Sequence, residues 1–507
     1  MTKKVLIETY GCQMNEADTE LMHGLLRKQG YEMTKDQSEA DVVLLNTCAV
    51  REKAEERIFG RLGWLKTLKK EKPDLVLGVT GCMAERMKKK LVERTPFVDL
   101  VVGPDAYRRL PTMVEDIRLR GDHAESEEVM EQEQSGLSLH NSGIQDPSQL
   151  DAQQEQMNPV KEKKKKKKKK KKIDPMIDVR LDKKEMYEKL EVDRVPGVSG
   201  WVSIQRGCDK FCSFCIVPFV RGRERSLSPQ QVVEQAQEMA QQGFREITLL
   251  GQTVSSYYER GCDFADLLSM VHEVEGIERI RFTSPYPNDF TDRLLHRLAE
   301  LPKVGKHLHL PVQSGNTRIL KDMRRGYSRE RFIELMHKVR EILPEYAVST
   351  DVIVGYPSET DEEFADTLSL MKEVRFDSAF MFYYSQRDGT LAARRKPDDV
   401  PLSLKKSRLA ELIAMQEQIS KEAYQSQVGR EHEVLVIGEG RRNPMQMMGR
   451  TSCFRMTIFD KGDYLPGDLI KVKVKRATSH TLFADVIEVL DRAPMAMEIA
   501  QALALHS

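Results

Sequence analysis

Residues 206–215 read Arg206-Gly207-Cys208-Asp209-Lys210-Phe211-Cys212-Ser213-Phe214-Cys215 and place three cysteines in a C-x3-C-x2-C run within one tight loop. Three thiolates with this spacing can bind three irons of a 4Fe-4S cube, whereas a structural zinc site or an ordinary ferredoxin cluster uses a fourth protein ligand. The next cysteine, Cys262, lies far along the chain. We therefore expect one iron to stay open for an exogenous ligand; the alternatives are a zinc knuckle or buried free thiols.

This loop resembles the signature of the radical S-adenosylmethionine (SAM) enzymes, in which the open iron binds the amino and carboxylate groups of SAM. Two flanking segments are similar to the methylthiotransferase branch of that superfamily: Gln205-Arg206-Gly207-Cys208 and Cys215-Ile216-Val217-Pro218-Phe219-Val220-Arg221-Gly222-Arg223-Glu224-Arg225-Ser226. The likeness extends over nearly the whole chain outside one insertion. It implies SAM and two 4Fe-4S clusters as cofactors.

Length and composition limit the class of protein. A chain of 507 residues is too long for one core and indicates about three domains. Charged residues make up 31%, yet the net charge is +1, so any basic surface has to be local. The apolar pattern contains no secretory signal and no membrane span, so we expect a cytoplasmic protein without a membrane partner. In a reducing compartment, the eight cysteines favour metal or redox chemistry over disulfides.

In the amino-terminal part, three short apolar strands each end in a cysteine, and a helical pattern follows each strand. The strands span Val5–Cys12, Val42–Cys48 and Leu75–Cys82. This alternation predicts a parallel α/β sheet whose ligands gather at the carboxyl ends of the strands. Cys12, Cys48 and Cys82 should therefore meet as a second three-cysteine iron-sulfur site, although each one alone is more typical of a buried small hydrophobe. The resemblance agrees, because methylthiotransferases carry an auxiliary cluster on three such cysteines.

Residues 121–176 differ sharply in composition from the rest of the chain. An acidic stretch comes first, then one rich in Ser, Asn and Gln, and Lys163–Lys172 is an unbroken lysine run. Such a segment cannot bury enough apolar area to offset its ordering entropy, so we expect disorder. The segment is either a solvated linker or a site that binds RNA phosphates without sequence specificity. The resembling family links its two cluster domains more briefly.

The central part repeats strand and helix six times, which predicts a partial parallel (β/α)6 barrel with its site at the carboxyl ends of the strands. The predicted strands are Val202–Gln205, Glu246–Gly251, Arg279–Ser284, His307–Pro311, Val348–Gly355 and Ser378–Tyr384. Polar residues at the strand ends suit a charged cofactor, although they also serve as helix caps. By resemblance, SAM should lie near Gln252, Ser284, Gln313 and Asp351.

Three arginines, Arg221, Arg223 and Arg225, follow the last cysteine of the loop. They could neutralise an anionic cluster and SAM, hold RNA phosphates, or lie on a solvated loop. We assign them as candidate RNA-binding residues.

The carboxyl-terminal part switches to alternating apolar and polar residues, which predicts a small β-barrel. Its predicted strands are His432–Ile437, Met445–Phe459, Leu469–Ala477 and Thr481–Val489. Lys471, Lys473 and Lys475 alternate with valines, so they form either a basic stripe for RNA phosphates or an ordinary solvated sheet face. The run Gly449–Arg455 resembles the TRAM domain, an RNA-binding barrel, except that Phe454 stands where family members often have Asn.

Together these patterns predict an α/β protein in five parts. They are an amino-terminal methylthiotransferase domain with the auxiliary cluster (1–120), the disordered insertion (121–176), the radical SAM domain (177–427), the TRAM-like domain (428–492) and a tail (493–507).

Within the methylthiotransferases, the segments Leu249–Val254, Phe282–Pro287 and Leu308–Gly315 look like the branch that converts N(6)-(dimethylallyl)adenosine (isopentenyladenosine) in tRNA to its 2-methylthio derivative. The resemblance implies that one SAM methylates sulfur held at the auxiliary cluster. A second SAM is cleaved reductively at Cys208, Cys212 and Cys215, and the resulting radical takes hydrogen from the adenine ring. No catalytic residue beyond the cluster ligands is assigned.

The implied partners are a tRNA anticodon stem-loop, an electron donor such as flavodoxin or ferredoxin, and a sulfur source. Alternative substrates within the family are threonylcarbamoyladenosine in tRNA or a ribosomal protein aspartate. From other classes, a noncatalytic iron-sulfur RNA-binding protein or redox sensor would need the clusters without the SAM-contacting strand ends. A zinc-binding RNA protein is a further alternative.

Overall fold

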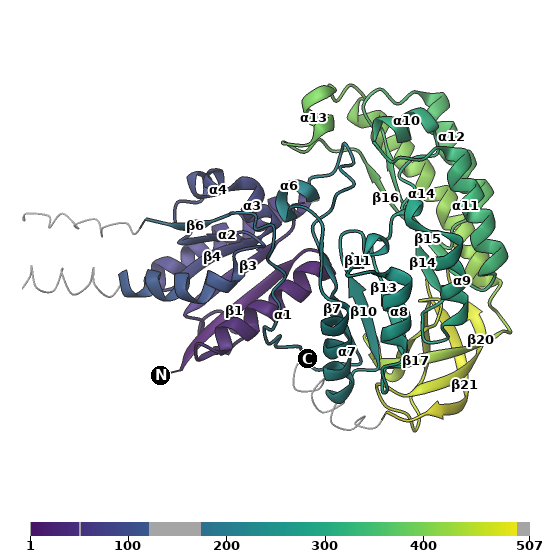
Figure 1. Ribbon diagram of the computed structural model, residues 1–507, viewed down its shortest axis with the longest axis horizontal. Coiled ribbons are helices and arrows are strands. Elements are labelled where there is room, and N and C mark those ends of the chain that lie inside the picture. The colour runs from purple at the N-terminus through teal and green to yellow at the C-terminus, as the bar shows by residue number, and fades with distance from the viewer. Residues whose placement is uncertain (1, 50–51, 121–173, 494–507) are drawn as a thin grey trace, which may run out of the picture.

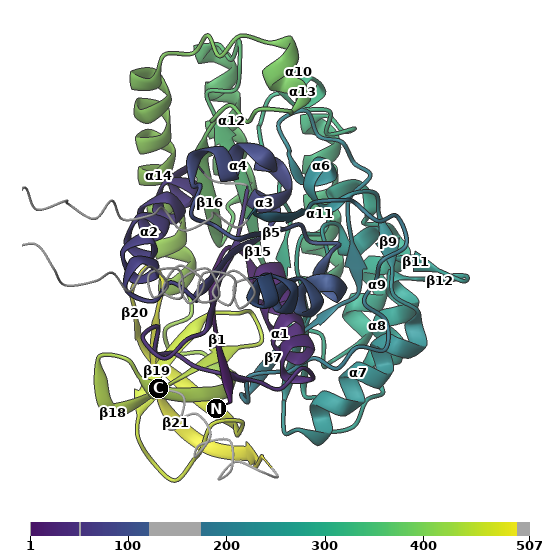
Figure 2. The same cartoon turned by 90° about the vertical axis from the view of Figure 1, so that its left-hand side faces the viewer.

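The structure is a computed structural model, and it describes residues 2–49, 52–120 and 174–493. These residues form an α/β domain, a large central domain and a small β-barrel packed against the end of the central domain (Figure 1). Seen after a quarter turn, the α/β domain lies in front of the central one (Figure 2). The insertion expected at 121–176 lies outside the described residues except for its last three, and the tail expected at 493–507 lies outside them except for Ala493.

The amino-terminal sheet is parallel and has the order β2-β1-β3-β4-β5-β6. Every residue of the central strands β3 and β4 is buried, because helices cover both faces of the sheet. The strands are β1 Lys3–Tyr10, β2 Tyr31–Met33, β3 Val42–Thr47, β4 Val76–Gly81, β5 Leu100–Val102 and β6 Met176–Asp178. The helices are α1 Gln13–Arg27, α2 Glu52–Glu71, α3 Cys82–Met87 and α4 Lys89–Arg94, and residues 110–120 are also helical.

The last strand of this sheet comes from beyond the insertion. Ile177 of β6 pairs with Val101 of β5, and the Gly103 N–H donates to the Asp178 carbonyl over 2.7 Å. The boundary expected between residues 176 and 177 therefore cuts through a strand of the amino-terminal domain. The insertion interrupts this domain before its last strand, and a pattern of only three residues was too short to show it in the sequence.

The central domain confirms the predicted parallel β/α repeat. Two three-stranded sheets, β13-β10-β7 and β14-β15-β16, are joined by a parallel bridge between Ile280 and Val304. The strands are β7 Ser199–Ser203, β10 Glu246–Leu250, β13 Arg279–Phe282, β14 His307–His309, β15 Ala347–Val354 and β16 Ser378–Tyr383. The main helices are α7 Pro229–Gln241, α8 Phe264–His272, α9 Asp292–Glu300, α11 Arg329–Ile342, α12 Asp361–Val374 and α14 Leu402–Gln425.

Side-chain caps start these helices where the sequence places a hydroxyl or a carboxylate. Ser228, Thr291, Ser328 and Thr360 each accept a backbone N–H from the first turn of the helix that follows. Such caps fix where each helix leaves its loop. The helices then pack one large apolar core between themselves and the strands.

The carboxyl-terminal strands close into a barrel in the order β17-β18-β19-β21-β20. They are β17 Glu431–Gly440, β18 Asn443–Thr451, β19 Met456–Asp460, β20 Leu469–Ala477 and β21 Leu482–Asp491. The single strand expected over Met445–Phe459 is wrong, because Phe454 adopts a φ of 65° and the chain reverses there. Phe454 then stacks on His307 of the central domain, with ring centroids 5.5 Å apart. Among the described residues, no helix is long and apolar enough to cross a membrane.

The position of β6 generates a pair of deletions with opposite outcomes. Removing residues 124–172 should leave the amino-terminal domain folded, because β6 and the helix before the insertion both remain. Removing residues 124–180 should lower the midpoint temperature of unfolding of this domain by about 10 °C, because the edge of β5 loses its partner strand. Differential scanning calorimetry compares the two variants, and equal midpoints would contradict the role of β6.

Candidate functional site

The three amino-terminal cysteines lie along one edge of the sheet, as predicted. Their strands are neighbours, and Tyr10, Thr47 and Gly81 are paired in register at the ends of β1, β3 and β4. Cys48 follows Thr47 and Cys82 follows Gly81, whereas Cys12 comes two residues after Tyr10, at the start of α1. The sheet therefore gathers the three thiols at its carboxyl edge.

The pKa of the Cys82 thiol also indicates that the three thiols lie close together. Burial raises the pKa of the Cys82 thiol to about 12, and the thiols of Cys48 and Cys12 push it in the same direction. Gly81 makes the sharp turn possible with a φ of +89°, and a Cβ there would lie 2.5 Å from the Thr47 carbonyl oxygen.

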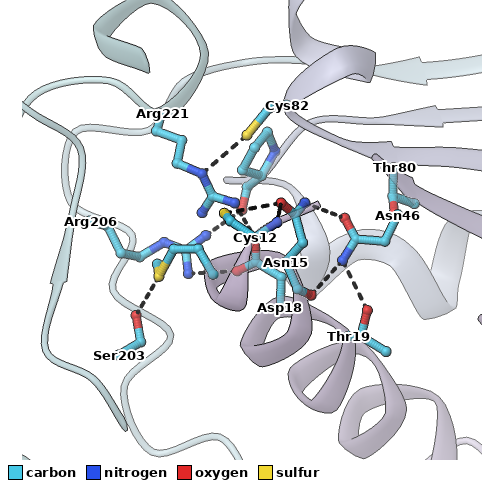
Figure 3. Close-up of polar contacts among 12 residues, drawn as sticks. Cys12, Asn15, Asp18, Thr19, Asn46, Thr80, Cys82, Ser203, Arg206 and Arg221 are labelled. Atoms are coloured by element: carbon cyan, nitrogen blue, oxygen red, sulfur yellow. Dashed lines mark hydrogen bonds and ion pairs between the residues drawn. The ribbon is translucent and has the colours of Figure 1, made fainter. Parts of the chain in front are cut away.

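A buried amide network holds the Cys12 end of α1 against β3. The Asn15 side chain accepts from the Cys12 N–H at 3.3 Å and donates to Asn46 Oδ1 at 3.0 Å. Asn46 in turn donates to the Asn15 carbonyl and to Thr19 Oγ1, as Figure 3 shows. These bonds fix Cys12 relative to the sheet.

The second cysteine loop begins after β8 Gln205–Arg206, and two of its cysteines contact side chains of the barrel. Cys208 Sγ lies 3.2 Å from Thr253 Oγ1, and Cys212 Sγ accepts from Arg325 Nη1 at 3.2 Å. Burial raises the pKa of Cys215 to about 12. Gly207 has a φ of +79°, and a Cβ there would lie 2.0 Å from the Arg223 carbonyl oxygen, so the loop needs glycine at this position.

Each thiol set has three cysteines, the number that a 4Fe-4S cube with one open iron uses. Among residues 2–49, 52–120 and 174–493, no three His, Cys, Asp or Glu side chains are close enough to hold one metal ion. A 4Fe-4S cube spreads three thiolates over three irons. Each set also has one buried arginine that donates to a sulfur: Arg221 Nε to Cys82 Sγ at 3.1 Å, and Arg325 Nη1 to Cys212 Sγ at 3.2 Å. Hydrogen bonds to ligand sulfurs are typical of such clusters.

One buried carboxylate joins the two sites. Asp18 of α1 accepts from Arg206 Nη1 at 3.0 Å with one oxygen and from Arg221 Nη2 at 2.7 Å with the other (Figure 3). Arg206 precedes the second cysteine loop, and Arg221 ends α6 Val217–Arg221, which follows it. Beside them, Ala49 and Cys82 pack against Ile216 and Val220. The rim of the sheet and the cysteine loop of the barrel are thus in direct contact.

Of the four residues expected near SAM, Gln252 contacts this loop directly. Gln252 Oε1 accepts from the Gly207 N–H at 2.5 Å. Ser284 and Gln313 adopt φ values of +55° and +73°, strained conformations that cluster at functional sites. Asp351 lies inside β15 rather than at its end, where its carboxylate approaches His309 Nε2 at 3.4 Å and its carbonyl accepts from the Gln313 N–H. Their contacts with SAM stay predictions.

The RNA-binding assignment of two arginines is wrong for this structure. Arg221 is 3% exposed and paired with Asp18, and the Arg225 side chain is 8% exposed and paired with Asp105. Their guanidinium groups are used inside the domain interface, so they do not face a solvent-borne phosphate. Arg223 is different, because its side chain is 63% exposed. Of the alternatives left open by the sequence, the neutralisation of an anionic cluster fits Arg221.

The lysine stripe of the barrel is not a purely basic face. Lys471 Nζ lies 2.9 Å from Glu431 and Lys475 Nζ lies 2.7 Å from Asp485. Lys473 is exposed, and its partners in the strand register are also Glu431 and Asp485. The flanking strands β17 and β21 supply these acids, which the pattern of β20 alone could not show. Exposed ion pairs are weak, so phosphates can still compete for the lysines.

The sequence reasoning missed a basic cleft of about 1390 Å³ between the amino-terminal and central domains. It lies between the α3–α4 segment, residues 109–116, β6 and its continuation, and residues 386–389. Its charged lining residues are Arg86, Lys88, Lys89, Lys90, Arg94, Arg109, Arg180 and Arg387, against Glu55, Asp116, Asp178 and Asp388. The concentration of basic residues between Arg86 and Arg94 was the available signal.

Three family models match consecutive parts of the chain. They are the Uncharacterized protein family UPF0004 (residues 4–103), the Radical SAM superfamily (202–371) and the TRAM domain (425–487).

Curated relatives cover nearly the whole chain. Those named tRNA-2-methylthio-N(6)-dimethylallyladenosine synthase include proteins from Desulforamulus reducens, 38% identical, and Parabacteroides distasonis, 40% identical, each over 96% of both chains. The protein of that name from Bacillus subtilis is 39% identical over 96% of this chain and 86% of its own. Among solved structures, the radical SAM methyltransferase TsrM from Kitasatospora setae matches with a TM-score of 0.49 and 14% identity, over 78% of this chain and 74% of its own.

The two cysteine sets lie on different domains, so each set should bind its iron independently of the other. Anaerobic reconstitution should give about eight irons per chain, on the premise of two four-iron cubes. The variant in which Cys208, Cys212 and Cys215 are all Ala should keep about four, because the other set lies on a different domain. Iron and sulfide assays with metal analysis measure both numbers. Zinc as the only stoichiometric metal would contradict the assignment.

Proposed function

Because the chain belongs to the family of tRNA-2-methylthio-N(6)-dimethylallyladenosine synthases, we propose that it places a methylthio group on N(6)-(dimethylallyl)adenosine next to a tRNA anticodon. It is a radical SAM methylthiotransferase that uses SAM and 4Fe-4S clusters. The observation that carries the proposal is the direct contact between the two cysteine sites, through Cys82 and Ile216 and through the Asp18 carboxylate. This contact supports the proposal, because a sulfur held at one site would lie near SAM bound at the other.

We propose Cys208, Cys212 and Cys215 as ligands of the SAM-binding cluster and Cys12, Cys48 and Cys82 as ligands of the auxiliary cluster. When bound, the first cluster supplies the electron that cleaves SAM and the second holds the sulfur to be transferred. Two arginines of the chain contact these cysteine sulfurs. Arg325 and Arg221 donate hydrogen bonds to the sulfurs of Cys212 and Cys82, and a positive donor of this kind would stabilise a cluster-bound thiolate.

The polar residues around the barrel mouth support a SAM site. Gln252 fixes the loop backbone at Gly207, and Gln313 and Asp351 come together across adjacent strands. We propose that these three and Ser284 contact SAM, because they present polar groups at or near the carboxyl ends of the barrel strands. A charged cofactor needs such groups to replace the water it loses.

For the tRNA, we propose that the modified adenine enters between the two domains while its phosphates lie along the basic cleft. Helix α3 starts at Cys82 and runs to Met87 at the cleft. On the other wall, Gly389 lies against Ile216 of the cysteine loop. Phosphates held there would flank a base that reaches the cysteine sites, and an anticodon loop offers unstacked bases for such entry. Arg223 and Lys473 are further exposed candidates for phosphate contacts.

The reaction consumes electrons and one sulfur atom per turnover. We therefore propose an external electron donor such as flavodoxin or ferredoxin, and an external sulfur source. Because tRNA is the substrate, we place the enzyme in the cytoplasm.

The substrate assignment is tested in a strain that lacks the gene. Mass spectrometry of its tRNA nucleosides should show isopentenyladenosine accumulating without the methylthio group, and the gene on a plasmid should restore the methylthio product. If tRNA nucleosides are unchanged and a ribosomal protein has lost a methylthio group instead, the tRNA substrate is wrong although the reaction class stands.

The cleft is tested by charge reversal at matched sites. Changing Lys89 and Lys90 together to Glu should raise the tRNA dissociation constant and reduce the slope of log Kd against log salt by about 1 for each phosphate that the variant no longer binds. The same change at Lys372 and Lys421, which are exposed on α12 and α14, is the control and should alter neither. Filter binding at several salt concentrations gives both quantities, and an equal effect of the two pairs would remove the cleft from the RNA interface.

The barrel lysines need a separate variant. Changing Lys471, Lys473 and Lys475 together to Glu should also weaken tRNA binding, while SAM cleavage without RNA stays intact. Wild-type affinity in this variant would confine the RNA interface to the cleft and the exposed arginine.

A further inference from the structure

The two arginines that donate to cysteine sulfurs differ in how many of their guanidinium nitrogens have a hydrogen-bond partner. Every guanidinium nitrogen of Arg325 has a partner: Tyr327 Oη at 3.0 Å, Cys212 Sγ at 3.2 Å and the Pro311 carbonyl at 2.8 Å. Arg221 uses Nε for Cys82 and Nη2 for Asp18, but its Nη1 is buried and has no hydrogen-bond partner in the described part of the chain. A buried donor without an acceptor destabilises the protein, and a charged donor does so more strongly.

The buried charges around Cys82 are also unequal. Arg206, Arg221 and Arg225 face only two buried carboxylates, Asp18 and Asp105, among the residues that the structure describes. An arginine guanidinium stays charged in proteins, so Arg221 is cationic. One positive charge is therefore left without a carboxylate, next to a three-cysteine site. A cube with a core charge of about +2 and three thiolates carries a net charge of about −1, which matches it.

We propose that Arg221 is reserved for the auxiliary cluster, and that Asp18 is the positioning residue that aims it. The Nε group donates to the Cys82 sulfur, and the Nη1 group gains its acceptor only when the cluster is bound. Asp18 orients the guanidinium through its second oxygen while its first oxygen holds Arg206, two residues before Cys208. The same carboxylate thereby relates the auxiliary cluster to the loop that binds SAM.

This arrangement has a redox consequence. A positive donor beside a cluster stabilises the reduced form, which carries one more negative charge, and so raises the reduction potential. The alternative is that Arg221 is only a structural clamp between the domains. A clamp stabilises the protein equally with and without a cluster, whereas a reserved donor contributes more when the cluster is present.

The test uses the full chain with Cys208, Cys212 and Cys215 changed to Ala, so that iron reports the auxiliary site alone. In this background, Arg221→Met removes the charge and all donors at similar length. The matched control is Arg225→Met, which removes a buried arginine of the same network that pairs with Asp105 and contacts none of the cysteines through a hydrogen bond among the described residues.

Two measurements are made on each variant without tRNA: the rise in the unfolding midpoint on cluster reconstitution, and the reduction potential by EPR-monitored titration. For Arg221→Met we expect a smaller rise in the midpoint and a potential shifted to more negative values. Arg225→Met should lower the midpoints of the apo and reconstituted forms equally and shift the potential less than Arg221→Met does, because Arg225 donates to no cysteine sulfur among the described residues. Asp18→Asn should also give a smaller rise in the midpoint, because Arg221 then loses the carboxylate that aims it at the cluster.

If Arg221→Met does not fold, Arg221→Lys carries the test, since it keeps the charge but cannot make three fixed hydrogen bonds. It should bind iron with an intermediate potential. Wild-type potential and an unchanged rise in the midpoint, in either variant, would overturn the proposal and leave Arg221 as a structural clamp. Because no tRNA is present, this outcome is independent of whether the substrate assignment holds.

Discussion

The structure depends on one buried carboxylate that serves two domains. Asp18, which is 1% exposed, forms ion pairs with two arginines, one from each side of the barrel's cysteine loop. Buried ion pairs of this kind contribute little net stability, because desolvation offsets their attraction. Their effect is on geometry: removing any partner leaves a charge buried alone, so only one relative placement of the two domains satisfies all three groups. That placement brings Cys82 against Ile216.

The chemistry follows from this placement. A parallel sheet and a partial barrel both present their ligands at the carboxyl ends of their strands. Here the sheet edge contacts the residues that flank the barrel's cysteine loop, so the two sets of thiols lie at one domain interface. A transfer reaction that needs a sulfur held at one centre and a radical made at another requires such an arrangement. The basic cleft opens at the same interface, between α3 and the loop that packs on Ile216.

Much of this was predictable from the sequence, because strand-end cysteines and the C-x3-C-x2-C spacing are local patterns. The gathering of Cys12, Cys48 and Cys82 needed only the rule that parallel strands share an edge. What failed depended on contacts between distant segments. Arg221 looked available to RNA because its partner, Asp18, lies 203 residues away in another domain. Similarly, β6 was not predicted, because β5, the strand that it pairs with, precedes the insertion.

The most direct test of the account is a single-turnover assay with the reconstituted enzyme, SAM, a reductant and tRNA that carries isopentenyladenosine. The account predicts that Cys82→Ala still cleaves SAM to 5'-deoxyadenosine, because the barrel loop is intact, but forms no methylthio nucleoside. Formation of that nucleoside at the wild-type rate by Cys82→Ala would contradict the claim that sulfur is delivered from the sheet edge to the barrel.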